Sequence, residues 1–204
     1  LALMAFDFGV LKDENQLWKW DGQKRMLDDW NRDHTAASWM QHSVVWFSQR
    51  LTPLIGQSRP QNYLKDFHYG NEDLAGGLTQ AWLNEPDAAE PALRISAYEQ
   101  AEFMRAFWQN RLKVKPSALA LTQKITYLET SPAGYQLHGK TGSNFYTANR
   151  KKRLGWFIGH LEKGSEEYIV VTNFSDTEEP NESVFGGKKA KEITKSFLAS
   201  KNLW

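Results

Sequence analysis

The spacing of apolar residues changes near residue 135, and that change limits the folds this chain can adopt. Before this point apolar side chains recur every three or four residues, which predicts amphipathic helices. From residue 135 to residue 175 apolar and polar residues alternate over three stretches, which predicts strands, and a helical spacing then returns. Helices are therefore expected over residues 1–8, 36–54, 60–67, 96–112, 116–128 and 188–200, and strands over residues 135–142, 153–161 and 167–175.

Turn and capping signals support these boundaries. Ser96 and Glu99 have the spacing of a capping box at a helix start, and residues 163–165, Lys-Gly-Ser, form a reversing turn between two predicted strands. The last helix is expected to bury an apolar face that includes Ile193, Phe197 and Leu198. Helices, then strands, then a closing helix predict an α+β fold, in which an antiparallel sheet is flanked by terminal helices and joined to a helical subdomain.

Composition excludes several classes of function. The 204 residues carry 25 Lys and Arg against 24 Asp and Glu, a net charge of +1, so neither a nucleic-acid partner nor a membrane surface is expected. With no Cys there is no disulfide framework and no thiol nucleophile, although this does not decide the compartment. The length suits one or two domains with a substantial core. Any partner must therefore be recognised through a specific site.

Residues 134–141, Gly-Tyr-Gln-Leu-His-Gly-Lys-Thr, match every fixed position of the phosphate-loop pattern G-x-x-x-x-G-K-[ST]. The four residues between the two glycines alternate in polarity like a strand and include no further Gly to curl around a phosphate. Residues 142–149 have no helical period, so no helix N-terminus follows the motif. A nucleotide site is not expected, and a Lys-Thr-Gly triplet on a strand requires another explanation.

Three short polar motifs in order along the chain provide that explanation. They are Ser43-Val-Val45, Tyr69-Gly-Asn71 and Lys140-Thr-Gly142. Their order and separation resemble those of the penicillin-recognising serine enzymes, and in particular of the class D (oxacillinase-type) β-lactamases. The resemblance extends to Lys19-Trp-Asp-Gly22, to Trp82-Leu83 thirteen residues after Tyr69, and to Leu93-Arg-Ile-Ser96. It implies a β-lactamase/transpeptidase-like fold and a single penicillin-recognising domain, of which residues 1–204 would be the C-terminal majority.

The family pattern also includes Ser-x-x-Lys, which supplies the nucleophile, and this motif is absent from the sequence. The resemblance places it just upstream of Leu1, so the N-terminal strands, the nucleophilic Ser and its Lys are expected to precede this chain. In class D enzymes that Lys carries a CO2-derived carbamate, which acts as the general base; no other cofactor is expected. A dry pocket favours the carbamate because only the neutral amine reacts. By resemblance, Val45, Leu83 and Trp82 would form that pocket, and the Trp82 indole N–H would donate to the carbamate.

The same resemblance assigns roles to the remaining motif residues. Ser43, expected inside a helix, would bridge Lys140 and the upstream Lys and pass a proton to the leaving nitrogen. Lys140 would place a positive charge near the substrate carboxylate, with Thr141 as a hydroxyl donor. Ser143 would offer its backbone N–H to the oxyanion from an edge strand, and Gly142 would leave room for the substrate.

Several of these residues also have ordinary structural interpretations. Tyr69-Gly-Asn71 has the composition of a turn, so Asn71 is expected to shape the site rather than to act chemically. Trp82 is one of nine Trp, for which a core position is the usual role. His138 is a lone His on a predicted strand, for which a packing or surface role is usual. The other four His residues show no metal-ligand spacing with one another or with carboxylates, so no metal is predicted. Many class D enzymes bind the substrate carboxylate with an Arg near the start of the last helix, whereas here Lys189 is nearest by position and lacks the bidentate fork of Arg.

The function that the resemblance implies is hydrolysis of penicillins and related β-lactams through a serine acyl-enzyme. The expected protein is bacterial, periplasmic or secreted, and a monomer or homodimer. The alternative is a β-lactam sensor domain, which shares the fold and similar motifs and is acylated without turnover. A cell-wall transpeptidase is disfavoured because Val45 stands where those enzymes usually have Asn.

Overall fold

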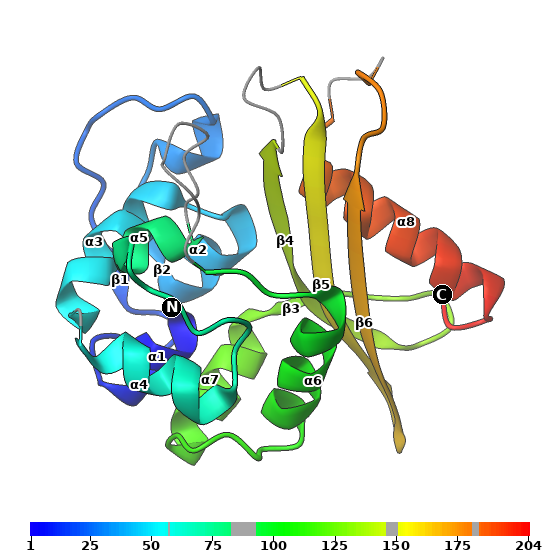
Figure 1. Ribbon diagram of the computed structural model, residues 1–204, viewed down its shortest axis with the longest axis horizontal. Helices are drawn as coiled ribbons and strands as arrows, with labels where there is room; N and C mark the ends of the chain where they lie inside the picture. The colour runs from blue at the N-terminus through cyan, green and yellow to red at the C-terminus, as the bar shows by residue number, and fades with distance from the viewer. Residues whose placement is uncertain (57, 83–92, 146–150, 181–183) are drawn as a thin grey trace.

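The computed structural model describes residues 1–56, 58–82, 93–145, 151–180 and 184–204, and Figure 1 shows a helical part beside a sheet. The helical part contains α1 (Ala2–Asp7), β1 (Leu17–Trp18), the 3-10 helix η1 (Asp28–Trp30), β2 (His34–Thr35), α2 (Ala36–His42), α3 (Val45–Ile55), α4 (Ser58–Phe67), α5 (Gly77–Trp82) and α7 (Pro116–Ile125). The sheet contains β3 (Tyr127–Thr130), β4 (Gln136–Phe145), β5 (Arg153–Lys163) and β6 (Glu166–Ser175), with α6 (Ala97–Trp108) on one face and α8 (Gly186–Ser200) on the other. The predicted α+β fold is confirmed.

The sheet is antiparallel throughout, in the order β3-β4-β5-β6. β4 pairs with β5 along its whole length. β3 pairs only with the start of β4, up to His138, and the Gly139 N–H then donates to the Thr126 carbonyl at 2.8 Å. Over residues 140–145, β4 therefore has β5 as its only neighbouring strand among the described residues, and its other edge is open.

Each part has its own hydrophobic cluster. In the helical part the rings of Trp18 and Trp39 stack on Phe47 at centroid distances of 4.3 and 4.9 Å. The second cluster lies between the sheet and α8 and includes the buried residues Tyr135, Leu137, Phe157, Leu161, Ala190 and Leu198. Aromatic packing of this kind accounts for part of the high Trp content, since each ring buries a large apolar area.

The helix predicted over residues 36–54 is in fact two helices, α2 and α3, which separate at Ser43. Ser43 has φ 51° and ψ 49°, a left-handed conformation that a continuing right-handed helix does not contain. The apolar period continues across the break because Val44 and Phe47 are both fully buried. Periodicity alone therefore did not reveal the break, and the prediction that Ser43 lies inside a helix is wrong.

Two other helix ends differ from prediction. The helix predicted over residues 116–128 ends at Ile125, and β3 begins at Tyr127. α6 ends at Trp108 rather than at residue 112. Among the described residues, no helix combines the length and apolar character needed to cross a membrane.

The buried face of α8 also differs from prediction. Ile193 and Phe197 are 41% and 55% exposed, and only Leu198 of the predicted face is buried. The helix instead buries Gly186, Gly187, Ala190, Thr194 and Leu198. Thr194 is tolerated there because its hydroxyl lies 2.6 Å from the Thr172 hydroxyl and donates to the Ala190 carbonyl at 2.9 Å.

Two glycines let the start of α8 approach the sheet closely. A Cβ atom at Gly187 would lie 2.7 Å from the Gly142 carbonyl oxygen, and one at Gly186 would lie 2.5 Å from the Leu154 carbonyl oxygen. Both distances are too short for any other residue without movement of the backbone. The N-terminus of α8 therefore packs directly against β4 where the Lys-Thr-Gly motif lies.

Candidate active site

Ser43 occupies the connection between α2 and α3. Its N–H and that of Val44 both approach the Trp39 carbonyl, which closes α2, and the Phe47 N–H donates to the Val44 carbonyl at 3.2 Å, which opens α3. Val44 is fully buried, whereas Ser43 is exposed. The left-handed turn thus presents the Ser43 hydroxyl at the surface of the helical part.

Lys140 on β4 joins this hydroxyl to the sheet. Its ammonium Nζ donates to Ser43 Oγ, a residue 97 positions away in the chain. The same ammonium donates to the Thr141 carbonyl at 2.9 Å and lies 3.4 Å from Thr141 Oγ1. The first and third sequence motifs therefore meet in space.

Burial lowers the pKa of Lys140 from 10.5 to about 8, because a charged amine is disfavoured away from water. At neutral pH the group is thus mainly an ammonium with a neutral minority, about a tenth at pH 7. Such a group can both attract an anion and exchange a proton with Ser43.

The residues after Lys140 lie on the open stretch of β4. The hydroxyl of Ser143 accepts a hydrogen bond from the Gly187 N–H at 2.8 Å, so this side chain binds the start of α8. A Cβ at Gly142 would meet only Trp156 Cβ, at 3.4 Å, so the described structure leaves space there. Lys189 follows Gly187 by two residues and is half-buried, which puts it on the turn of α8 next to the motif.

The Tyr69-Gly-Asn71 motif forms a separate turn. The Tyr69 hydroxyl donates to Gln100 Oε1 at 2.7 Å, and burial raises the pKa of Tyr69 to about 12. Asn71 and Arg94 exchange two hydrogen bonds, from the Asn71 N–H to the Arg94 carbonyl at 2.9 Å and from the Arg94 N–H to Asn71 Oδ1 at 2.8 Å. Gly70 has φ +58°, and a Cβ there would lie 2.0 Å from the Arg94 carbonyl oxygen. These contacts connect the turn to residues 94–100, which fits a shape-giving role for Asn71.

Trp82 contacts α3 in the described structure. Its indole N–H donates to Thr52 Oγ1 at 3.0 Å, on α3. Thr52 follows the half-buried Val45 by seven residues, about 10 Å along a helix axis. The predicted contact of this N–H with a carbamate stays a prediction, because the Lys that would carry the carbamate is not in this sequence. Leu83 lies outside the described residues.

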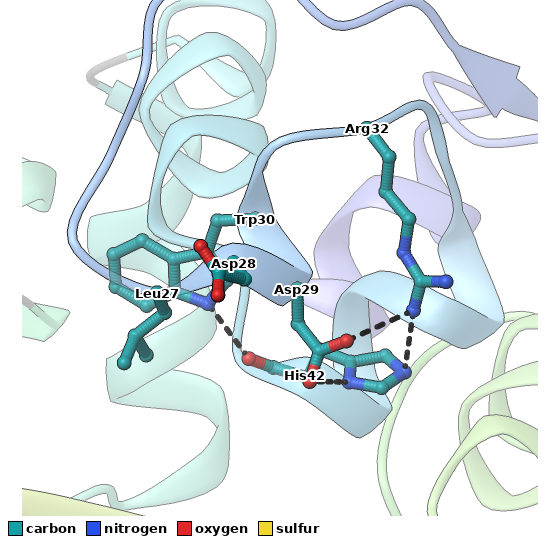
Figure 2. Close-up of a pocket in the computed structure, with 6 residues that line it drawn as sticks. All are labelled: Leu27, Asp28, Asp29, Trp30, Arg32 and His42. Carbon is teal, nitrogen blue, oxygen red and sulfur yellow. Dashed lines mark hydrogen bonds and ion pairs between the residues drawn. The ribbon is translucent and has the colours of Figure 1, made fainter.

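A hollow of about 400 Å³ lies between η1 and the end of α2 and was not anticipated from the sequence. Its lining is Leu27, Asp28, Asp29, Trp30, Arg32 and His42, drawn in Figure 2. Arg32 donates toward His42 Nε2 and lies at the same distance, 3.3 Å, from an Asp29 oxygen, while His42 Nδ1 is 3.2 Å from the other Asp29 oxygen. These side chains come from η1, the following loop and α2, so no local pattern groups them.

One further group of potential ligands was not anticipated from the sequence. The structure brings His160 on β5 together with the carboxylates of Glu162 and Glu167. Two of these residues, His160 and Glu162, are two positions apart on one strand, and Glu167 lies across the strand pair. This differs from the ligand spacings of helical and zinc-finger metal sites, which are the ones that a sequence reveals.

Comparison with known proteins places this arrangement in a family. A sequence model of the penicillin binding protein transpeptidase domain matches residues 1–199. The β-lactamase OXA-1 of Escherichia coli is 40% identical over 209 residues, which cover 99% of this chain and 69% of that protein. The chain thus spans about two thirds of the length of that relative. The structure of the class D β-lactamase BAT-2 matches 100% of this chain and 77% of its own, at 32% identity and a TM-score of 0.83.

A sensor protein is also similar. The regulatory protein BlaR1 of Bacillus licheniformis is 30% identical over 203 residues, which cover 100% of this chain and 31% of that protein. The structure of the C-terminal domain of the Bacillus licheniformis BlaR penicillin-receptor matches 100% of this chain and 76% of its own, with 30% identity and a TM-score of 0.86. On the family match, the identity to OXA-1 and the agreement with solved class D structures, this chain belongs to the penicillin-binding transpeptidase-domain family and, within it, to the class D serine β-lactamases.

Proposed function

We propose that the intact protein hydrolyses the β-lactam ring of penicillins and related compounds through a serine acyl-enzyme. The observation that carries this proposal is the contact between Lys140 Nζ and Ser43 Oγ, which links a helical motif to a strand motif across the two parts of the fold. A hydroxyl held by an amine whose pKa is about 8 can relay a proton near neutral pH. In the reaction this relay would deliver the proton to the ring nitrogen as the amide bond breaks.

The open edge of β4 supports a binding mode for the substrate. Residues 140–145 have no strand neighbour on that side within the described chain, so this edge of β4 can accommodate a ligand lying alongside. We assign the substrate carboxylate to Lys140 and the Thr141 hydroxyl, and one oxyanion donor to the Ser143 N–H. Gly142 leaves space for that approach. Lys189, on the turn of α8 beside this strand, would add positive charge where other class D enzymes use Arg.

The nucleophile and the general base belong to the Ser-x-x-Lys motif, which we place upstream of Leu1 in the intact protein. Residues 1–204 are then the larger, C-terminal share of one catalytic domain. The base would be a CO2-derived carbamate on that Lys, with no other cofactor. Val45 and Leu83 would line its pocket, and the Trp82 indole would turn from Thr52 to the carbamate when the upstream Lys is present.

The remaining assignments follow from the same family. The partners would be small β-lactam molecules, not nucleic acid and not a membrane. The protein would act in the periplasm or outside the cell, as a monomer or homodimer.

The test is the lifetime of the penicillin adduct on the intact protein, measured by mass spectrometry with and without bicarbonate. We expect an adduct that forms and disappears quickly while hydrolysed penicillin accumulates, and faster loss of the adduct with bicarbonate. Ser43→Ala should slow adduct formation by about 10²- to 10⁴-fold, the range for a positioned acid–base group. Ser117→Ala, on the exposed first turn of α7, is the control and should behave as the parent protein. Absence of any adduct would refute the proposal.

A β-lactam sensor domain is the second candidate, because the BlaR1 receptor domain matches this chain over its whole length. A sensor would form the same adduct through the same Ser43 and Lys140 contact but would hold it for hours. Adduct lifetime therefore separates the two functions, whereas adduct formation alone does not.

A further inference from the structure

Three potential ligands converge on the sheet face covered by α6, beside the turn between β5 and β6 (Figure 1). His160 and Glu162 are two residues apart on β5, so their side chains share a face. Glu167 on β6 is the direct register partner of Glu162. One ligand atom from each of the three lies within 4.8 Å of those of the other two. The proposed β-lactam chemistry uses none of these residues.

His160 is unusual for a buried polar residue. It is 1% exposed, and its ring stacks on Trp108 at a centroid distance of 3.8 Å and an angle of 8°. Within the part of the chain that the structure describes, neither ring nitrogen has a hydrogen-bond partner. An unsatisfied buried nitrogen costs about 1–3 kcal/mol, and native proteins contain few of them.

The two carboxylates have no Lys or Arg partner within the described part of the chain. Glu162 and Glu167 face each other across the strand pair, where like charges destabilise a sheet. Among the described residues each approaches a histidine rather than a Lys or Arg: Glu162 lies 3.7 Å from His138 and Glu167 lies 3.9 Å from His160. The two negative charges would be balanced by a divalent cation.

We propose that His160, Glu162 and Glu167 form a binding site for a divalent transition metal ion, zinc by preference. One imidazole nitrogen and two carboxylate oxygens are a donor set that zinc accepts, whereas calcium and magnesium prefer oxygen alone. The exposed side of Glu167, whose side chain is 56% accessible, gives the ion an entry path and leaves a position for water. The ion ties β5 to β6 and, through the ring stack on Trp108, the hairpin to α6. Its role is structural and separate from the serine chemistry.

The direct test is calorimetric titration of Zn²⁺ into the chelator-treated full-length protein. We expect one ion per chain. His160→Phe keeps a ring against Trp108 but removes the nitrogen ligand, and Glu167→Gln removes one carboxylate at an exposed position. Each substitution should weaken Zn²⁺ binding at least tenfold. Because Glu167→Gln does not alter the core, it decides the question even where His160→Phe does not fold.

The chain offers a matched control. His68 Nδ1 lies 3.8 Å from Glu72 Oε1, close to the His160–Glu167 distance, but its side chain is 91% accessible and no second carboxylate joins the pair. His68→Asn suits the left-handed φ of 49° at this position and should leave Zn²⁺ binding unchanged.

Cobalt gives a second readout. Co²⁺ bound by this set should show visible absorption bands that are lost in His160→Phe. Failure of the parent protein to bind Zn²⁺ stoichiometrically, or equal affinity in the parent, His160→Phe and Glu167→Gln proteins, would overturn the assignment.

Discussion

Lys140 is expected to make the folded protein less stable at neutral pH than it would be without this charge. Burial lowers the pKa of its ammonium from 10.5 to about 8, so the folded state holds the proton less tightly than the unfolded chain. Stability then rises with pH wherever the unfolded chain binds more protons, here between about pH 8 and pH 10.5. Below about pH 8 the amine is charged in both the folded and the unfolded chain, so the folded state bears the full free-energy cost of burying the charge. At 1.36 kcal/mol for each pKa unit it amounts to about 3 kcal/mol at most.

The substitution Lys140→Met tests this directly, because Met keeps the unbranched apolar stem and removes the charge. Its free energy of unfolding in urea should exceed that of the parent by about 2–3 kcal/mol at pH 7 and by almost nothing at pH 10.5. Lys113→Met, at an exposed position, is the control and should differ little from the parent at either pH. A Lys140→Met protein that is less stable than the parent at pH 7, or a gain that does not change with pH, would refute the reasoning.

Three further substitutions probe the surroundings. Gly187→Ala would place a Cβ 2.7 Å from the Gly142 carbonyl oxygen and should lower stability by about 1–3 kcal/mol in thermal unfolding; an unchanged midpoint would contradict the close approach of α8. Tyr69→Phe removes the hydroxyl that donates to Gln100 Oε1, and Gln100 is only 3% exposed. The free energy of unfolding in urea should fall by about 1–3 kcal/mol; no decrease would show that water replaces the Tyr69 hydroxyl. Trp82→Ala in the intact protein should slow deacylation more than acylation, with partial recovery in bicarbonate; equal loss in both steps without recovery would count against a carbamate role.

The sheet was predictable from the sequence because three of its strands carry their own signal. β5 alternates between buried and half-buried positions over its first seven residues, and the reversing turn at residues 163–165 joins it to β6. In β4 and β6 the alternation that predicted strands is one of residue type in the sequence. β3 was missed because its four residues follow α7 almost directly, and Leu128 also fits the helical spacing. A strand this short is defined by its partner rather than by its own sequence. α5 was missed for a similar reason, since six residues are too few to show a period.

The candidate site was predictable only through the order of the motifs. No local pattern pairs Ser43 with Lys140 across 97 residues, and only the family resemblance brought them together. The hollow lined by Asp29, Arg32 and His42 and the group around His160 had no such guide. Both depend on side chains that meet through tertiary structure, which hydrophobic periodicity does not describe.

The most informative error concerns Ser43. Its left-handed conformation costs a non-glycine residue roughly 1–2 kcal/mol and breaks a helix that periodicity predicts as continuous. Such violations of local rules persist where function requires them, and here the break is what presents the hydroxyl to Lys140. Two substitutions separate the conformation from the hydroxyl. Ser43→Gly and Ser43→Ala both remove the hydroxyl, but Gly adopts φ 51° without strain, so the Gly protein should be about 1 kcal/mol more stable than the Ala protein in urea unfolding. Both should lose acylation to the same extent. Equal stability of the two proteins would mean that the chain relaxes out of the left-handed turn once the hydroxyl is absent, and that the contact with Lys140 itself maintains the break.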